Sequence, residues 1–256
     1  MNKPLTEPEA AGMDQLQLRR IAEHLEQRYV LPGKIPGCAI AVRRGGKLAY
    51  LHHSGYRDVD RKKPVTADTV FRIYSMTKPI TSVALMTLWE QGVLSVNDPV
   101  THYLPEWSEQ RVWTGGSWPD FQTRPVDAPM RIRDLLSHTS GLTYDIMRAG
   151  NLDYAYRKLG VGRPQGNYSF NDFIGQLAEL PLAFSPGARW NYSVATDVRG
   201  VIVERASGMA FAEYLQQTVF DPLEMHETGF SPRDDQIERF ACSYTRDSKK
   251  ALTLFD

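Results

Sequence analysis

The sequence predicts an α+β protein in which a mainly helical lobe is inserted into a lobe built on an antiparallel sheet flanked by helices. Two β-favouring runs near the start of the chain and shorter strand-like pieces near its end bracket a long middle part with helical periodicity. We therefore expect residues 1–75 and 225–256 to form a discontinuous sheet lobe and residues 76–224 to form the helical lobe. A functional site is expected between the two lobes.

The first predicted elements are a helix and a hairpin. Asp14 can cap a helix, and apolar side chains then recur at one-face spacing, which predicts a helix over 14–30. Two β-favouring runs follow, and Gly45-Gly46 between them is typical of a tight turn. The sequence therefore predicts a β-hairpin over 37–54.

The middle of the chain is predicted to be mostly helical. The segment 70–92 changes from a strand-like to a helical pattern at Ser75 and ends at Gly92, a residue suited to a left-handed cap. Tryptophans and prolines without a period predict an irregular excursion over 105–130. Short helices are expected at 131–137, 170–180, 193–207 and 210–219, and strand-like pieces at 227–231 and 239–246.

Charge and cysteine content exclude several classes of partner. The 256 residues carry 30 basic and 30 acidic side chains, which gives no electrostatic reason to expect a nucleic-acid or anionic-membrane partner. Two cysteines, Cys38 and Cys242, are too few for a disulfide framework or a zinc site. No apolar run is long enough for a secretory signal or a membrane span, which predicts a cytoplasmic location.

The most informative short motif is Ser75-Met76-Thr77-Lys78. A spacing of three on a helix places the serine hydroxyl and the lysine amine on one face. A serine needs a neighbouring base to become a nucleophile, and a lysine can be that base when burial or cationic neighbours lower its pKa. Backbone N–H groups at a helix start can also face an oxyanion. Such a pair also arises by chance as a capping serine and a solvated lysine, so the motif alone is weak.

Three long stretches surround this motif and carry a resemblance. They are FRIYSMTKPITSVALMTLWEQGVLSVNDPVTHYLPEW, MRIRDLLSHTSGLTY and FSPGARWNYSVATDVRGVIVERASGMAFAEYLQQTVFDPLEM. The sequence resembles the serine hydrolases related to class C β-lactamases and DD-peptidases. Within that group, the SMTK motif and the pair Tyr192-Ser193 look most like the family VIII carboxylesterases.

The resemblance implies a sheet lobe and a helical lobe with the site between them, and an acyl-enzyme mechanism without cofactor or metal. By position, Ser75 matches the nucleophile, with its backbone N–H in the oxyanion hole, Lys78 the activating lysine and Tyr192 the tyrosine that exchanges the proton. A phenol of pKa about 10 becomes a usable base when a neighbouring ammonium stabilises the phenolate. Tyr168 competes for this role, but it lacks the S-P-G-x-x-W context.

A Ser-His-Asp site is the rival interpretation. His138 lies in LLSHTSGL, a stretch that the family shares, and the resemblance implies that it holds a loop near the cleft. The other five histidines are expected to be ordinary surface or core residues.

Two departures from the family affect the substrate prediction. Val194 stands where β-lactamases have an asparagine, which favours esters over β-lactams. Aromatic residues near the site would suit apolar acyl or aryl groups. The substrate-binding candidates are Tyr144, Trp113 and Val194.

The second departure concerns length, because family members continue beyond the end of this sequence. The further part would carry strands that complete the sheet, a motif facing Ser75 and a second oxyanion-hole N–H, and without it the hairpin at 37–54 would have unpaired edges. We expect a separate polypeptide or another copy of the chain, as a homo-oligomer, to complete the sheet, or the chain to be a fragment of a longer product.

The predicted function is hydrolysis of short-chain carboxylic esters, which are small-molecule substrates, through an acyl-enzyme on Ser75. A β-lactamase or DD-peptidase-like amide hydrolase and an acyltransferase would use the same residues. A truncated module that binds ligand without turnover is the non-enzyme alternative.

Overall fold

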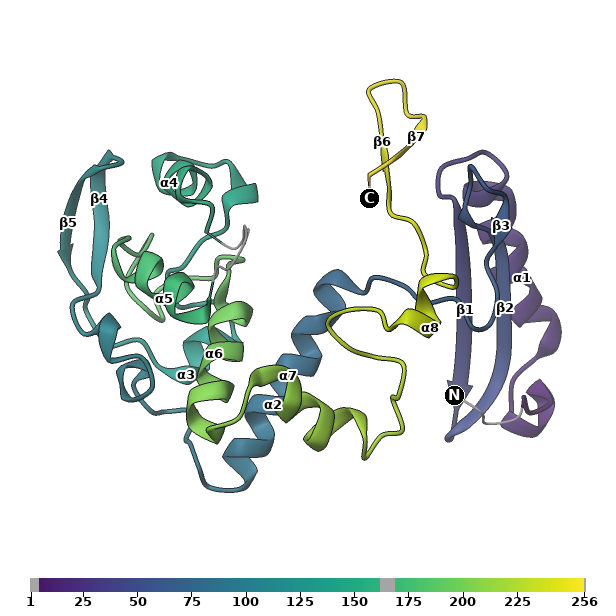
Figure 1. Cartoon of the computed structure of the whole chain (residues 1–256), viewed down its shortest axis with the longest axis horizontal. Helices are drawn as coiled ribbons and strands as arrows, with labels where there is room; N and C mark the ends of the chain where they lie inside the picture. The colour runs from purple at the N-terminus through teal and green to yellow at the C-terminus, as the bar shows by residue number, and fades with distance from the viewer. Residues whose placement is uncertain (1–4, 162–168, 256) are drawn as a thin grey trace. The chain divides into compact units, whose positions relative to one another are not determined.

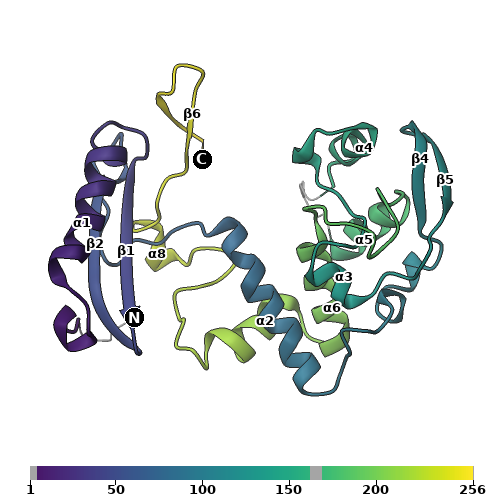
Figure 2. The same cartoon turned by 180° about the vertical axis from the view of Figure 1, so that it is seen from behind.

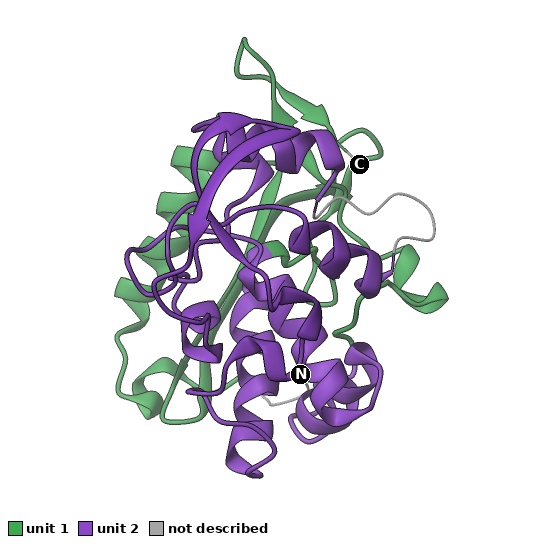
Figure 3. Ribbon diagram, turned by 90° about the vertical axis from the view of Figure 1, so that its left-hand side faces the viewer, with its two compact units in different colours: residues 1–74, 227–256 green, residues 75–226 purple. Residues whose placement is uncertain are grey.

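The computed structural model describes residues 5–161 and 169–255 (Figure 1). The chain divides into two compact units, which Figure 3 shows in different colours. The sheet unit comprises Met1–Tyr74 and Glu227–Asp256, and the helical unit comprises Ser75–His226.

The sheet unit is built on the hairpin that the two-glycine turn predicts. Strands β1 (Gly37–Arg44) and β2 (Lys47–Asp58) are antiparallel, and a short strand β3 (Lys63–Pro64) pairs with the other edge of β2. The turn residues Gly45 and Gly46 both have positive φ, which glycine adopts without a steric penalty. The predicted hairpin is confirmed.

Helix α1 (Gln15–Leu25) packs against β2, as Figure 2 shows from behind. It begins where expected, because the Asp14 carboxylate accepts hydrogen bonds from the backbone N–H groups of Leu16 and Gln17. The helix continues as a π-helical segment, Glu26–Val30, so the predicted helix over 14–30 is confirmed.

The last part of the sheet unit differs in part from the prediction. Residues 227–231 form turns instead of a strand, and helix α8 (Asp234–Ile237), which the sequence did not predict, follows. Within 239–246 only β6 (Tyr244–Arg246) is a strand, and it pairs with β7 (Leu252–Leu254). Small and apolar residues in 227–231 resemble a strand locally, but no partner strand is present among the described residues to satisfy their backbone.

The 3₁₀ turn Tyr74–Met76 contains the boundary between the two units in sequence, and α2 (Thr77–Glu90) follows it in the helical unit. The predicted short helices are confirmed, and Ser169 caps one of them while Gly208 ends another in the left-handed conformation. They are α3 (Ile132–Leu136), α5 (Phe170–Ala178), α6 (Ala195–Ser207) and α7 (Phe211–Leu215), the last continuing as a π-helical segment, Gln216–Phe220. Helix α4 (Asn151–Leu159) was not predicted.

The predicted irregular excursion over 105–130 is wrong in part, because it contains a β-hairpin. Strands β4 (Arg111–Ser117) and β5 (Asp120–Pro125) pair in antiparallel fashion. The register shifts between Trp113 and Gly115, which breaks the alternation of apolar and polar residues and hides the strand from a periodicity analysis.

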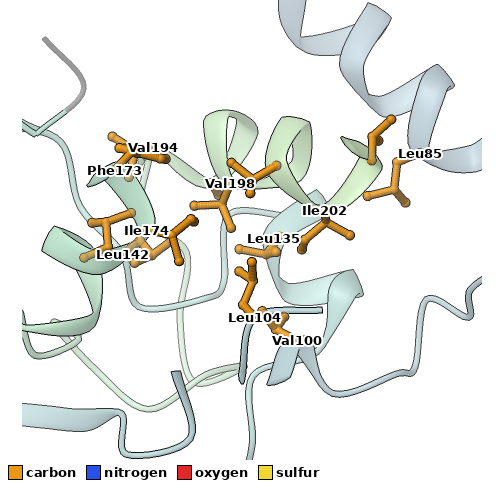
Figure 4. Close-up of a cluster of buried hydrophobic side chains, with 14 of the residues drawn as sticks. Leu85, Val100, Leu104, Leu135, Leu142, Phe173, Ile174, Val194, Val198 and Ile202 are labelled. Carbon is orange, nitrogen blue, oxygen red and sulfur yellow. The ribbon is translucent and has the colours of Figure 1, made fainter. Parts of the chain in front are cut away.

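The core of the helical unit surrounds α6. Val198 and Ile202 on this helix are fully buried and lie beside Leu135 of α3, with Leu85 of α2 and Ile174 of α5 in the same cluster (Figure 4). A helix that is buried on nearly all sides is the centre of a bundle, and its first turn is held as firmly as the core itself. The residues that enter α6 from its N-terminal side are therefore on a rigid support.

Candidate active site

Ser75 and Lys78 lie at the start of α2. Ser75 is exposed in the 3₁₀ turn before the helix, and Lys78 is half-buried in the first helical turn. Lys78 Nζ donates a hydrogen bond to Ser75 Oγ over 3.3 Å, as the spacing of three in sequence requires. Tyr74, directly before the serine, has a φ of 41°, a left-handed conformation that non-glycine residues rarely adopt and that is frequent at functional sites.

Tyr192 completes a three-residue cluster from a distant part of the sequence. Its hydroxyl lies 3.2 Å from Ser75 Oγ, and Lys78 Nζ lies 4.9 Å from the centroid of its ring. Hydrogen bonding to Lys78 and to Ser75 lowers the pKa of Tyr192 from its ordinary value, although burial opposes this effect. The ammonium therefore stabilises the phenolate, as a base in this position requires.

A loop formed by residues 138–144 holds Tyr192 in place. The backbone N–H of Asn191 donates to the His138 carbonyl over 2.8 Å, and the backbone N–H of Val194 donates to the Thr143 carbonyl over 3.1 Å. The Asn191 side chain adds a bond to the Leu142 carbonyl over 2.9 Å. Tyr192 is thus anchored on both of its sequence sides, and its hydroxyl has little freedom to move away from Ser75.

Gly141 shapes this supporting loop. It has a φ of 86°, and a Cβ atom there would lie 2.3 Å from the Phe184 carbonyl oxygen. The backbone N–H of Ala183 also donates to the Gly141 carbonyl over 2.7 Å. Only glycine combines the left-handed backbone with this close approach.

His138 is a neighbour of Tyr192 in this structure. Its Nδ1 lies 3.2 Å from Ser193 Oγ, and its ring centroid lies 5.2 Å from that of Tyr192. Burial, together with the positive charges of Arg199 and Lys78, lowers the pKa of His138, so that the imidazole is neutral at pH 7. Among the described residues, the groups within hydrogen-bond distance of Ser75 Oγ are Lys78 and Tyr192, and the geometry does not form a Ser-His-Asp chain.

The three substrate-binding candidates occupy different environments. The Tyr144 ring stacks on Tyr192, and Trp113 on β4 lines a hollow of about 330 Å³. Val194 is fully buried in the core, so it offers no surface to a substrate, and its prediction as a binding residue is corrected. Tyr168 lies outside the described residues.

The hollow beside Trp113 is lined by residues of the helical unit. Two of them, Trp190 and Asn191, directly precede Tyr192 in the sequence. Its apolar walls include Trp190, Phe184 and Met147, and Arg189 and Asn191 add polar groups. Trp190 is 64% exposed, a large exposed fraction for this side chain. A concave surface with aromatic walls and a few polar groups is typical of a small-molecule site.

Two charged residues near the site were not predicted. Asp197 and Arg199 lie on α6, and the signal that could have revealed them is a pair of charges in the otherwise apolar run SVATDVRGVIV. Asp197 is exposed, yet partial desolvation raises its pKa, against the opposing effect of the Lys78 and Arg199 charges. Arg199 is only 2% exposed, and a buried guanidinium in an apolar helix needs a specific reason, because Arg is rarely fully buried without one.

Within 5–161 and 169–255, no helix is long and apolar enough to cross a membrane, and no group of three or more His, Cys, Asp or Glu side chains could hold a metal ion.

The fold, with a serine three residues ahead of a lysine at the start of a long helix, is that of the β-lactamase/DD-peptidase-like proteins. The model of the Beta-lactamase family matches residues 18–254, and the chain belongs to this family. The predicted fold class is confirmed by this match.

Relatives within the family include an esterase. Esterase EstB of Burkholderia gladioli is 33% identical over 244 residues, which are 93% of this chain and 57% of EstB. An uncharacterized protein of Mycobacterium tuberculosis is 38% identical over 220 residues, which are 86% of this chain and 54% of that protein.

Among solved structures, EstCE1, described as a hydrolase with promiscuous acyltransferase activity, matches with a TM-score of 0.81 at 29% identity. The match covers 94% of this chain and 60% of EstCE1. The chain thus spans 54–60% of the length of these three relatives.

Proposed function

We propose that the chain carries the nucleophile of a serine esterase that hydrolyses short-chain carboxylic esters through an acyl-enzyme on Ser75. The observation that carries this proposal is the position of Ser75 Oγ, which is 3.3 Å from Lys78 Nζ and 3.2 Å from the Tyr192 hydroxyl. A serine within reach of two groups that exchange protons with each other has what nucleophilic catalysis needs.

In acylation, Ser75 Oγ attacks the ester carbonyl and its proton passes to the Lys78–Tyr192 pair. The tetrahedral oxyanion faces the backbone N–H of Ser75 at the start of α2. When the intermediate collapses, the bond to the alcohol breaks and the Tyr192 hydroxyl protonates the leaving oxygen. Lys78 and Tyr192 titrate as one coupled pair, so the first base is the pair and not either residue alone.

Deacylation uses the same groups in reverse. The Lys78–Tyr192 pair takes a proton from a water molecule, whose oxygen attacks the acyl carbon. The bond between that carbon and Ser75 Oγ then breaks, the proton returns to Oγ, and the carboxylic acid leaves. The lowered pKa of Tyr192 supports this role, because it makes the phenolate form of the base easier to reach.

Two observations favour esters as the substrate class. EstB, which is 33% identical, is an esterase by name. Val194 also stands where a β-lactamase has an amide that would hold a β-lactam side chain, and it is buried in the core. The hollow lined by Trp113 and Trp190 would take the apolar acyl or aryl part of the ester.

Acyl transfer is the second candidate, and the description of EstCE1 favours it. The same acyl-enzyme would react with an alcohol in place of water. Adding methanol during hydrolysis of p-nitrophenyl butyrate and measuring the ratio of methyl ester to butyrate separates the two activities.

The decisive experiment compares the chain with its Ser75→Ala variant at equal concentration of folded protein. We expect the parent to hydrolyse p-nitrophenyl butyrate and the variant to lose at least about 1000-fold in kcat, as loss of a nucleophile typically causes. Equal rates for both proteins would refute the mechanism. Faster turnover of a chromogenic cephalosporin than of the ester would favour a β-lactamase, and a stable adduct on Ser75 would favour a binding module.

A further inference from the structure

A buried arginine links the two helices that carry the proposed catalytic residues. Arg199 on α6 is only 2% exposed. Its Nη1 donates to Ser82 Oγ on α2 over 2.6 Å, and its Nη2 donates to Thr196 Oγ1 over 2.6 Å. Its Nε is buried and has no hydrogen-bond partner among the described residues.

The two hydroxyl groups that Arg199 holds are themselves close to the site. Ser82 Oγ donates to the backbone carbonyl of Lys78 over 2.8 Å, one helical turn back along α2. Thr196 lies in the first turn of α6, four residues after Tyr192. The guanidinium therefore connects the turn that carries Lys78 with the helix start that follows Tyr192.

This arrangement is a poor solution for stability alone. A buried guanidinium with an unsatisfied N–H destabilises a fold relative to an apolar side chain of similar volume. The α6 residues on either side of Arg199, such as Val198 and Ile202, meet their neighbours through apolar side chains, and the charged contacts of Arg205 lie nearer the end of the helix. Packing of the α6 segment around Arg199 therefore does not need a charge. The presence of a buried arginine at position 199 must therefore be explained by the groups that it contacts, Ser82 and Thr196.

We propose that Arg199 is a positioning residue of the Ser75–Lys78–Tyr192 site, which fixes the Lys78 turn relative to Tyr192 and supplies a permanent positive charge beside them. The inference rests on the proposed function, because it assigns a role within that site. It predicts that removing Arg199 impairs the chemical step more than substrate binding and more than folding.

The charged and titratable groups around Arg199 come from two helices and two loops. They are Asp197 on its own helix, Lys78 on α2, and His138 and Tyr192 on the two loops before α6. Burial lowers the pKa of Arg199 to about 10, so it is charged at neutral pH. Its charge lowers the pKa values of His138 and Asp197. In a variant without this charge, both residues should therefore titrate at higher pH.

The test uses three variants and a matched control. Arg199→Met removes both the charge and the hydrogen bonds at similar volume, Arg199→Lys keeps the charge, and Ser82→Ala keeps the charge but removes the link to Lys78. Arg205→Met is the control, because Arg205 lies on the same helix but pairs with Glu106 away from the site. Each protein is assayed for kcat, KM and the pH profile of ester hydrolysis, and for the rate at which a fluorophosphonate labels Ser75.

For Arg199→Met we expect kcat and the labelling rate to fall about 10- to 100-fold, the effect of a small misplacement of reacting groups, with KM within about twofold. The titrations of His138 and Asp197 should move to higher pH and carry the acid limb of the pH profile with them, because both residues lose the positive charge that favours their deprotonated forms. Arg199→Lys and Ser82→Ala should lose kcat and keep the acid limb of the parent. Arg205→Met should match the parent.

A folded Arg199→Met variant with the kcat, labelling rate and pH profile of the parent would overturn the inference. Where that variant does not fold, parent-like kcat in both Arg199→Lys and Ser82→Ala overturns it. Failure of the proposed function is a separate result, since in that case the fluorophosphonate does not label Ser75 in the parent or the Ser75→Ala variant is equally active.

Discussion

The ring of Tyr144 stacks on the ring of Tyr192, with centroids 5.8 Å apart and planes inclined by 13°. Tyr144 ends the supporting loop of residues 138–144, and Tyr192 lies between the two residues that bond to that loop. The orientation of the proposed proton-exchanging tyrosine is therefore set both by backbone hydrogen bonds and by an aromatic neighbour.

Replacing Tyr144 by leucine should lower kcat about two- to tenfold, because an aromatic pair contributes roughly 0.5–1.5 kcal/mol beyond its buried area. Tyr144→Phe keeps the stacked ring and should retain most of the activity. Steady-state kinetics on a p-nitrophenyl ester checks both variants. A Tyr144→Leu enzyme as active as Tyr144→Phe would show that the stacking has no part in positioning Tyr192.

The lowered pKa of Tyr192 should disappear when Lys78 is replaced by methionine. The ammonium stabilises the phenolate, so its removal raises the pKa and moves ionisation of Tyr192 to higher pH. Titration followed by the ultraviolet absorbance of tyrosinate should show one tyrosine of the parent ionising ahead of the others. That early step should be missing in Lys78→Met and in Tyr192→Phe, and its persistence in Lys78→Met would contradict the assignment.

Trp113 should determine preference for the acyl group if the hollow beside it receives that group. Trp113→Ala should raise KM for p-nitrophenyl 4-phenylbutyrate about tenfold, because apolar contact area is lost, and leave p-nitrophenyl acetate nearly unchanged. Trp113→Phe, which keeps an aromatic wall, is the control. Equal effects on both esters would mean that the hollow does not bind the acyl chain.

Gly141→Ala should lower both the free energy of unfolding and kcat. The new Cβ would lie 2.3 Å from the Phe184 carbonyl oxygen at a φ of 86°, and such strain costs about 1–3 kcal/mol. Gly175→Ala is a matched control on α5, where nothing lies within 4 Å and alanine should add about 0.5–1 kcal/mol of stability. Urea unfolding and kcat measured on both variants test the prediction, which fails if Gly141→Ala is as stable as the parent.

The parts of the fold that could be predicted from the sequence are those with a local cause. Gly45-Gly46 specifies a hairpin turn, Asp14 caps α1, and the Ser75–Lys78 spacing places two side chains on one face. The hairpin of β4 and β5 was missed because its register shift at Trp113 leaves no regular alternation.

Non-local features of the site could not be predicted from spacing. The distance between Ser75 and Tyr192 depends on how α2 and α6 pack, and only the family resemblance pointed to this tyrosine. Val194 was assigned to substrate binding from its position after Tyr192, but the chain turns into α6 there and directs this side chain into the core. Arg199 was not predicted as part of the site, because its proposed role depends on a hydrogen bond to Ser82, which lies on another helix.

The hollow beside Trp113 shares Thr143 and Asn191 with the support of Tyr192, whereas Met147, Ala149 and Gly150 in its lining belong to a separate exposed segment. Met147, Ala149 and Gly150 on the rim of the hollow are exposed, whereas Tyr192 is tied to residues 138–144 at the edge of a rigid core. Substitutions at these three exposed positions should therefore change the shape of the hollow without displacing the Tyr192 hydroxyl. If the hollow receives the acyl group, the exposed residues Met147, Ala149 and Gly150 are the place to begin a directed-evolution library for a changed substrate range.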